Sequence, residues 1–121
     1  MEQIKLFDSE LKLMELMWKS APVSAKELTV LAEAQIGWNK NTTYTVLKKL
    51  IDKNAVKRDE PNFICTPLVS REQVREAETE SLINKLYDGS RKTFFAAFLN
   101  RDKLSADEIE ELRRIIEKSE G

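Results

Sequence analysis

Apolar residues at the start of the chain recur at intervals of three and four positions, the spacing of one buried face of a helix. A first helix is predicted from a cap at Asp8 or Ser9 to about Lys19. Its buried stripe consists of Leu11, Met14, Met17 and Trp18. A second helix is predicted from Ser24, which opens a Ser-x-x-Glu capping box, to about Ala34.

A third amphipathic helix is predicted over about residues 40–53, following Asn39, which is a favourable N-cap residue. Asn54 stands where a left-handed C-terminal cap is expected. Because the opposite face of this helix is polar, it should point to solvent. The buried stripe falls at i, i+3, i+4, i+7 and i+8 and consists of Thr43, Val46, Leu47, Leu50 and Ile51.

The pattern then changes to two short β-prone segments within about residues 55–66. They flank Glu60, Pro61 and Asn62, a sequence that suits a tight turn, and so predict a β-hairpin. Three helices followed by a hairpin are the order of elements in a winged helix-turn-helix, in which the hairpin is the wing.

From Ser70 onward the pattern is helical, with further capping boxes at Ser70 and Ser105. Helices are predicted from Ser70 to about Tyr87, over about 93–99, and from Ser105 to about Lys118. The predicted fold class is mainly α with a small β-hairpin wing, a winged helix-turn-helix followed by a C-terminal helical region. The predicted domains are a winged-helix domain, 1–69, and a C-terminal helical region, 70–121.

The chain has 121 residues with no histidine, one cysteine and three glycines. These counts exclude a His-based triad, a His/Cys zinc site, a disulfide framework and a glycine-rich phosphate loop. We therefore expect no enzyme activity, no catalytic residue, no metal site and no cofactor. Cys65 is expected to be a core residue, with a redox-sensing thiol as the alternative. Without a signal peptide or a long apolar run, the chain is expected to be cytoplasmic.

The net charge of −1 hides a local excess of positive charge. Residues 36–58 contain six basic residues and one acidic residue, which gives +5. Residues 70–121 contain ten basic and twelve acidic residues, which gives −2. The basic stretch covers the third helix and the first strand of the hairpin, and it predicts a local docking surface for an anion.

The position of this charge favours DNA as the anion. In a winged helix the third helix can lie in the major groove while the wing reaches the backbone. Asn and Thr side chains at the helix start can read base edges, and Lys48, Lys49 and Arg58 can bind phosphates. The alternative for Lys48, Lys49 and Lys53 is an ordinary solvated helix face. A winged-helix module that binds protein rather than DNA is the second hypothesis, and an enzyme is the weakest.

Residues 38–50 resemble the recognition-helix segment of the penicillinase-repressor family, the BlaI/MecI type. Residues 13–18, 102–105 and 110–112 resemble the same family. The resemblance implies a bacterial, homodimeric transcriptional repressor that binds a palindromic operator in double-stranded DNA. With the basic stretch, it gives the predicted DNA-binding residues Asn39, Lys40, Asn41, Thr42, Tyr44, Thr45, Lys48, Lys49 and Arg58.

The C-terminal half contains more apolar residues than three short helices obviously bury by themselves. A two-fold partner would cover the surplus, and the alternative is that these residues pack back on the winged helix as a single core. The family resemblance favours the dimer. Its predicted interface consists of Leu82, Ile83, Leu86, Tyr87, Phe94, Phe95, Phe98, Leu112 and Ile116.

The resemblance also implies a way in which repression ends. In the family, a membrane-bound sensor protease triggers cleavage in the C-terminal region, and the corresponding bond here joins Ala97 and Phe98. Ala97 stands where the relatives have Asn, which counts against cleavage. The alternative is that Phe94, Phe95 and Phe98 serve interface packing. The chain itself is not expected to insert into a membrane.

Overall fold

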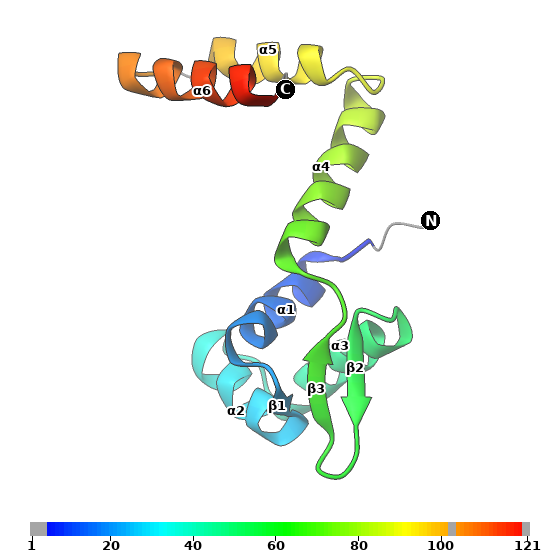
Figure 1. Ribbon diagram of the computed structural model, residues 1–121. Coiled ribbons are helices and arrows are strands. Elements are labelled where there is room, and N and C mark those ends of the chain that lie inside the picture. The colour runs from blue at the N-terminus through cyan, green and yellow to red at the C-terminus, as the bar shows by residue number, and fades with distance from the viewer. Residues whose placement is uncertain (1–4, 102–103, 120–121) are drawn as a thin grey trace. The chain divides into compact units, whose positions relative to one another are not determined.

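The structure is a computed structural model that describes residues 5–101 and 104–119 (Figure 1). All the helices and the hairpin predicted from the sequence are present, so the predicted fold class is confirmed. In chain order the elements are α1 (Asp8–Ser20), β1 (Val23–Ser24), α2 (Ala25–Gln35), α3 (Lys40–Asp52), β2 (Val56–Asp59), β3 (Ile64–Pro67), α4 (Arg71–Leu86), α5 (Arg91–Arg101) and α6 (Ala106–Ser119).

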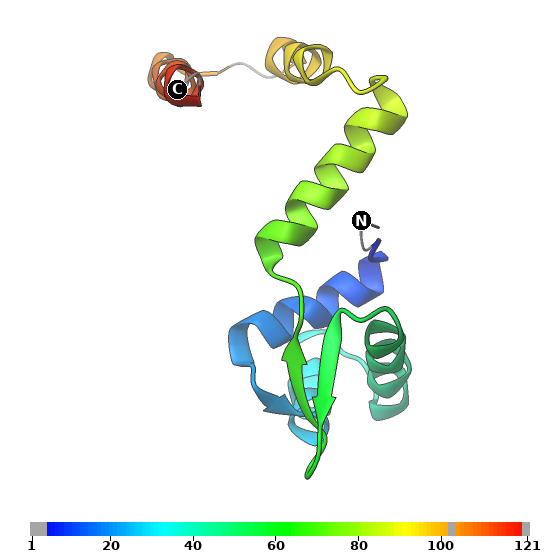
Figure 2. The same ribbon diagram turned by 45° about the vertical axis from the view of Figure 1, so that its right-hand side comes forward.

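The three strands form one antiparallel sheet in the order β1-β3-β2. The hairpin of β2 and β3 is seen in Figure 2, and in it Arg58 pairs with Cys65. On the other side of β3, Val23 of β1 also pairs with Cys65. The sequence does not predict β1, because two residues are too few to show an alternating pattern.

The ends of α3 form as the sequence predicts. Asn39 Oδ1 accepts a hydrogen bond of 2.8 Å from the Thr42 amide at the start of the helix. At the other end Asn54 has a left-handed φ of 62°. The Ala55 amide donates to the Leu50 carbonyl at 2.9 Å, which closes the C-terminal cap.

The start of α1 differs from the prediction. Asp8 and Ser9 are not its caps, because Phe7 is the N-cap residue and α1 begins at Asp8 itself. The Phe7 amide donates to Glu10 Oε1 at 2.7 Å, so the carboxylate three residues into the motif satisfies the helix start. The predicted capping boxes at Ser70 and Ser105 form with both of their hydrogen bonds. At Ser24 only half of the predicted box forms: Ser24 Oγ accepts from the Glu27 amide at 3.1 Å, and no return bond from the Ser24 amide to Glu27 is present among the described residues.

The hydrophobic core of the first part of the chain is built by α1, α2, α3 and the sheet. The predicted stripe of α3 is confirmed, since all its residues are buried except Ile51, which is half-buried. Cys65 is buried as predicted, and burial raises the pKa of its thiol to about 11. The largest fully buried apolar side chains are Leu13, Met14, Met17, Leu28, Leu47, Leu50, Val56 and Cys65.

The first turns of α4 pack on α1, so the first compact unit extends beyond the hairpin. Val74 belongs to the same core, and the Trp18 indole N–H donates to the Val69 carbonyl at 2.9 Å. The Arg71 guanidinium donates to both carboxylate oxygens of Glu15, at 2.8 and 3.2 Å. The chain divides into two compact units between residues 79 and 80. The division of function at residues 69 and 70 stays a prediction.

The second unit contains the end of α4 together with α5 and α6. The Phe94 ring lies 5.4 Å from the Tyr87 ring and 5.0 Å from the Phe98 ring, centroid to centroid. Among the described residues of this unit, Ile83 is the only buried hydrophobic side chain. In the ranges that the structure describes, no helix is both long and apolar enough to cross a membrane. The exposed large apolar residues of the second unit are Leu82, Leu86, Phe95, Phe98, Leu99, Ile109, Ile115 and Ile116.

Candidate nucleic-acid interface

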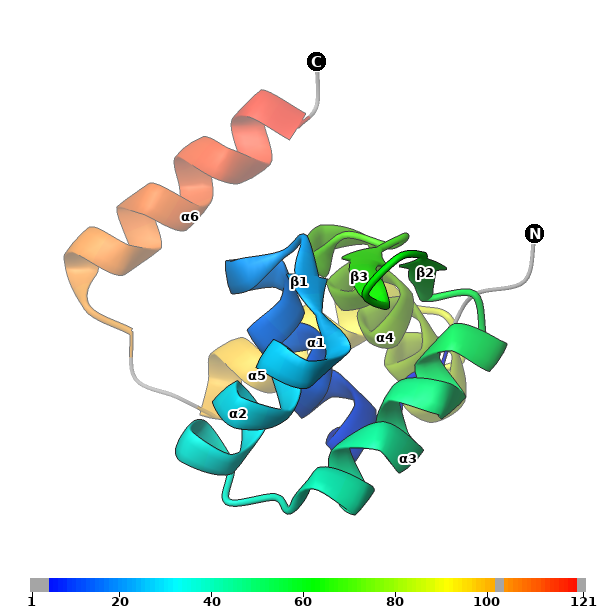
Figure 3. The same cartoon turned by 90° about the horizontal axis from the view of Figure 1, so that it is seen from below.

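The outward face of α3 carries most of the predicted DNA-binding residues. Asn41, Thr42, Thr45, Lys48 and Lys49 are all exposed, and their spacing of three and four residues places them on one stripe. Figure 3 shows α2 and α3 joined by the short turn between them. The two helices therefore form a helix-turn-helix whose second helix has a polar face open to solvent.

The polar side chains near the start of α3 differ in what they can still offer to a base. The side-chain oxygen of Asn39, Oδ1, already accepts the Thr42 amide at the start of the helix. Thr45 Oγ1 donates to the Asn41 carbonyl at 2.9 Å, which leaves its hydroxyl as an acceptor. The Thr42 hydroxyl makes no hydrogen bond within the described residues. It can therefore both donate to and accept from a base edge.

Lys40 and Tyr44 lie on the side of α3 that meets the wing. The half-buried Tyr44 ring lies 6.4 Å from the Phe63 ring, centroid to centroid. Lys40 Nζ lies 6.0 Å from the centre of the Tyr44 ring. Tyr44 thus contacts the hairpin turn, and its predicted contact with DNA stays a prediction.

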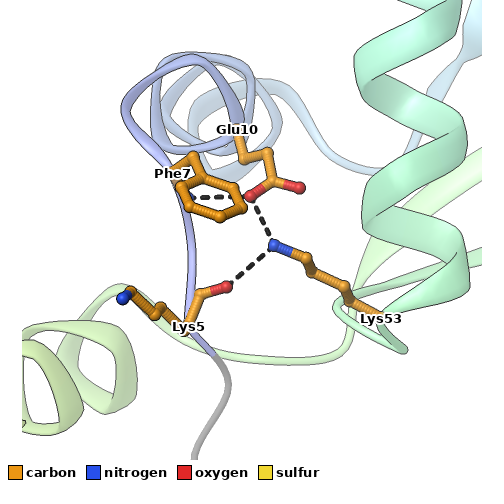
Figure 4. A network of polar contacts seen from close by, with 4 residues as sticks. All are labelled: Lys5, Phe7, Glu10 and Lys53. Carbon is orange, nitrogen blue, oxygen red and sulfur yellow. Dashed lines mark hydrogen bonds and ion pairs between the residues drawn. The ribbon is translucent and has the colours of Figure 1, made fainter.

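Lys53 contributes to the positive charge of the sequence but is bound within the protein (Figure 4). Its ammonium lies 2.6 Å from Glu10 Oε1 and donates to the Lys5 carbonyl at 2.9 Å. The same ammonium lies 4.5 Å from the centre of the Phe7 ring. Glu10 is only 1% exposed, so this is a buried carboxylate that requires its cation. Lys53 is therefore not part of a free positive surface.

The cations of the wing are also paired. Lys57 Nζ lies 3.5 Å from Asp59 Oδ2, and Arg58 Nη2 lies 2.8 Å from Glu60 Oε1. The two acidic residues lie just beyond residue 58, so counting to residue 60 lowers the net charge of the stretch from +5 to +3. Within the described residues, the basic side chains of this stretch without an acidic partner are Lys40, Lys48 and Lys49.

Three residues outside the predicted set shape this surface. Glu10 neutralises Lys53, Glu60 pairs with Arg58, and the Phe63 ring lies beneath the Arg58 guanidinium at 4.2 Å from Cζ to the ring centre. The alternation of residues along β2 and the adjacent turn could have suggested the Arg58–Glu60 pair. No local pattern indicates the Lys53–Glu10 pair, because 43 positions separate its members.

The predicted dimer-interface and cleavage residues lie in the second unit. Except for the buried Ile83, the interface residues are half-buried or exposed. An open groove of about 620 Å³ lies between Leu99 of α5 and one face of α6 that includes Leu112 and Ile116. Ala97 and Phe98 are exposed within α5, so their peptide bond is helical rather than extended.

Comparison with known proteins agrees with this description of the chain. The penicillinase repressor of Bacillus licheniformis is 29% identical over 116 residues, which cover 94% of this chain and 91% of that protein. The methicillin resistance regulatory protein MecI of Staphylococcus aureus strain N315 is 28% identical over 116 residues, which cover 94% of each protein.

Solved structures give the same fold. The DNA-binding domain of the repressor BlaI matches with a TM-score of 0.55 and 24% identity, over 60% of this chain and 90% of that one. The MarR repressor of Listeria monocytogenes matches with a TM-score of 0.50 and 18% identity, over 95% of this chain and 73% of that one. The family model of the penicillinase repressors matches residues 6–118, and the chain therefore belongs to that family.

Proposed function

We propose that the protein is a cytoplasmic homodimeric repressor in which α3 reads a palindromic operator and the wing binds the neighbouring DNA backbone. Its family membership makes it a DNA-binding transcriptional repressor, and thus a regulator. The observation that carries the finer proposal is the exposed polar stripe of α3, on which Thr42, Lys48 and Lys49 have no partner within the described residues. BlaI of Bacillus licheniformis in complex with a half-operator has the same fold, with a TM-score of 0.52 and 24% identity over 60% of this chain.

In this proposal the residues of the interface have two tasks. Asn41, Thr42 and Thr45 would face base edges, because short amides and hydroxyls on a groove-bound helix carry sequence readout. Asn39 would set the helix start and Tyr44 would position the wing. The side chains directed to phosphates are Lys40, Lys48, Lys49 and Arg58.

The exposed apolar side chains of the second unit support a dimer. An isolated copy leaves Leu86, Phe95 and Ile116 each more than half exposed. A second copy of the same chain would cover these side chains and the groove beside α6. Two linked recognition helices would then bind a palindrome with a high effective concentration.

DNA binding is tested with a duplex enriched by the full-length protein from a randomised library, compared with a scrambled duplex of equal length. The dimer should prefer the enriched duplex, and the slope of log K against log salt should be roughly −5 to −7 for six to eight phosphates. Replacing Thr42 with Val should reduce the preference, whereas Lys49→Ala should weaken both duplexes alike. Failure of the wild-type protein to bind either duplex would instead support the protein-interaction hypothesis, and equal binding of both duplexes would remove the sequence readout by α3.

Release by proteolysis between Ala97 and Phe98 is a further part of the proposal. Because that bond lies within α5, a protease would need the helix to open locally before an extended segment could enter its active site. A cut there would separate α6 from the rest of the chain and weaken the dimer. Mass spectrometry of the repressor from induced cells distinguishes this from interface packing, because intact protein during full derepression excludes cleavage.

A further inference from the structure

Arg58 of the wing is held on two sides by neighbouring side chains. Its guanidinium lies over the Phe63 ring, with 4.2 Å from Cζ to the ring centre. Its Nε donates to Glu60 Oε1 at 2.9 Å, and its Nη2 lies 2.8 Å from the same oxygen. The guanidinium still has N–H groups at Nη1 that no described residue occupies, and the side chain is 51% exposed. This cation is oriented before any DNA arrives.

The backbone shows that Phe63 occupies a position that a smaller residue would fill more easily. Asn62 and Phe63 both have left-handed φ angles, 73° and 51°. An aromatic residue is disfavoured there, whereas glycine adopts such angles without steric cost. The ring lies between Arg58 of the wing and Tyr44 of α3, so it links the position of the guanidinium to the recognition helix.

We propose that Phe63 is the platform that positions Arg58 for the DNA backbone and that Glu60 is an internal competitor for the same guanidinium. This inference rests on the proposed function, because the phosphate in question belongs to the operator. Both ligands of Arg58 are oxyanions. When the wing reaches the backbone, a phosphate at the free Nη1 N–H groups competes with the Glu60 carboxylate, because pairing with one anion weakens the attraction of the guanidinium for another.

Competition lowers DNA affinity without changing sequence preference, because the wing contacts carry no base information. An exposed ion pair is worth roughly 0.2–1 kcal/mol, which corresponds to about 1.4- to fivefold for each wing. Replacing Glu60 with Gln should therefore strengthen binding of a dimer, which has two wings, about two- to twenty-five-fold. The gain should be the same on an enriched and on a scrambled duplex.

A double-mutant cycle on the full-length protein tests the competition. Dissociation constants are measured by fluorescence anisotropy for the wild type, Glu60→Gln, Arg58→Gln and the double variant, on the enriched and scrambled duplexes. Arg58→Gln should weaken both duplexes and flatten the salt slope by about 0.9 for each protomer. In the Arg58→Gln background, Glu60→Gln should change the affinity less than twofold. An equal gain in both backgrounds would mean that Glu60 merely repels DNA, and the proposal would fail.

Asp59→Asn is the matched charge control, because it removes one negative charge from the same hairpin beside Lys57. The change in DNA affinity caused by Asp59→Asn should be the same in the wild type and in the Arg58→Gln background. Phe63→Gly tests the platform, since glycine fits the left-handed backbone and a folded, unstrained hairpin is expected. It should weaken both duplexes as Arg58→Gln does and add nothing in the Arg58→Gln background. Unchanged affinity in Phe63→Gly, with circular dichroism showing a folded protein, would overturn the role of the ring.

The outcomes separate this inference from the proposed function. Suppose that Thr42→Val loses sequence preference while Arg58→Gln has no effect on affinity. The sequence readout by α3 would then be supported, and the proposed role of Arg58, Phe63 and Glu60 in the wing would be refuted. A wild-type protein that prefers no duplex would refute the proposed function itself. Normal preference with the expected cycle supports both.

Discussion

Lys53 and Lys49 lie four residues apart at the C-terminal end of α3, yet the structure predicts opposite consequences when each is replaced by Gln. Lys53 Nζ lies 2.6 Å from the Glu10 carboxylate, which is 1% exposed and also accepts the Phe7 amide. Glu10 Oε2 is buried without a hydrogen-bond partner among the described residues, and Lys53 is the cation that pairs with this buried carboxylate. Lys49 is exposed and has no ionic partner within the described residues.

The expected magnitudes follow from these environments. Breaking a buried ion pair from one side costs about 3–5 kcal/mol, and because the Lys53 side chain is 30% exposed, we expect about 2–3 kcal/mol for Lys53→Gln. For a unit of this size that corresponds to a decrease in Tm of roughly 10–20 °C. Lys49→Gln should leave the free energy of unfolding within about 0.5 kcal/mol. It should flatten the salt slope of operator binding by about 1.8 for a dimer, whereas Lys53→Gln should not change the slope.

Urea unfolding followed by circular dichroism gives the free energy of unfolding, and fluorescence anisotropy titrations at several salt concentrations give the salt slope of operator binding. Binding is measured at a temperature at which both variants are folded. If Lys53→Gln flattened the slope of log K against log salt as much as Lys49→Gln, Lys53 would contact a phosphate. That result would refute the inference that the ion pair with Glu10 keeps Lys53 from contacting DNA. An unchanged free energy of unfolding in Lys53→Gln would refute the dependence of Glu10 on this cation.

Three further predictions concern the two units and their titratable groups. A fragment ending at Thr79 should be a folded monomer, because it keeps the first unit and lacks the exposed apolar surface of the second. It should bind the operator much more weakly than the full chain. If sedimentation showed the fragment to be a dimer, the interface would lie in the winged helix. The Cys65 thiol, whose pKa burial raises to about 11, should react with Ellman's reagent at pH 8 only after unfolding; rapid reaction of the native protein would contradict its burial. The hydrogen bond from Arg71 lowers the pKa of Glu15 below its usual value of 4.5. The pair should therefore stabilise the fold by less than about 1 kcal/mol at pH 7, and this stabilisation should be lost as the pH falls below about 4.5 through the lowered pKa. If the free energy of unfolding lost in Glu15→Gln did not shrink between pH 7 and pH 3, this prediction would be refuted.

The helices could be predicted because their signals lie close together in the sequence. Each capping box spans four residues, and the buried stripe of α3 repeats within nine positions. The bond from Thr45 to the Asn41 carbonyl also follows a local rule, since threonine in a helix often donates to the carbonyl four residues back. The polar face of α3 could therefore be predicted, whereas the difference between the engaged Thr45 hydroxyl and the free Thr42 hydroxyl is seen only in the structure.

The pairing of charges could not be predicted in the same way. Periodicity places Lys53 off the buried stripe but does not indicate that Glu10, 43 residues earlier, lies beside it. The extent of the first unit could not be predicted either. The sequence pattern assigns Arg71 and Val74 to the helix that follows the hairpin, but Arg71 pairs with Glu15 of α1 and Val74 packs in the core of the first unit. Such contacts depend on tertiary packing, which no short window of sequence contains.

The concentration of unpaired positive charge on α3 affects how the protein finds its operator. Each chain carries a net charge of −1, so beyond one Debye length, about 8 Å at physiological salt, it has little long-range attraction to DNA. In the proposed complex, Lys40, Lys48 and Lys49 would attract DNA only when α3 is already near the groove. Association should then be slower than for a strongly basic protein, and residence on unrelated sequences short. A search by repeated dissociation and rebinding, rather than by long sliding along the duplex, is the kinetic consequence of pairing Lys53, Lys57 and Arg58 within the protein.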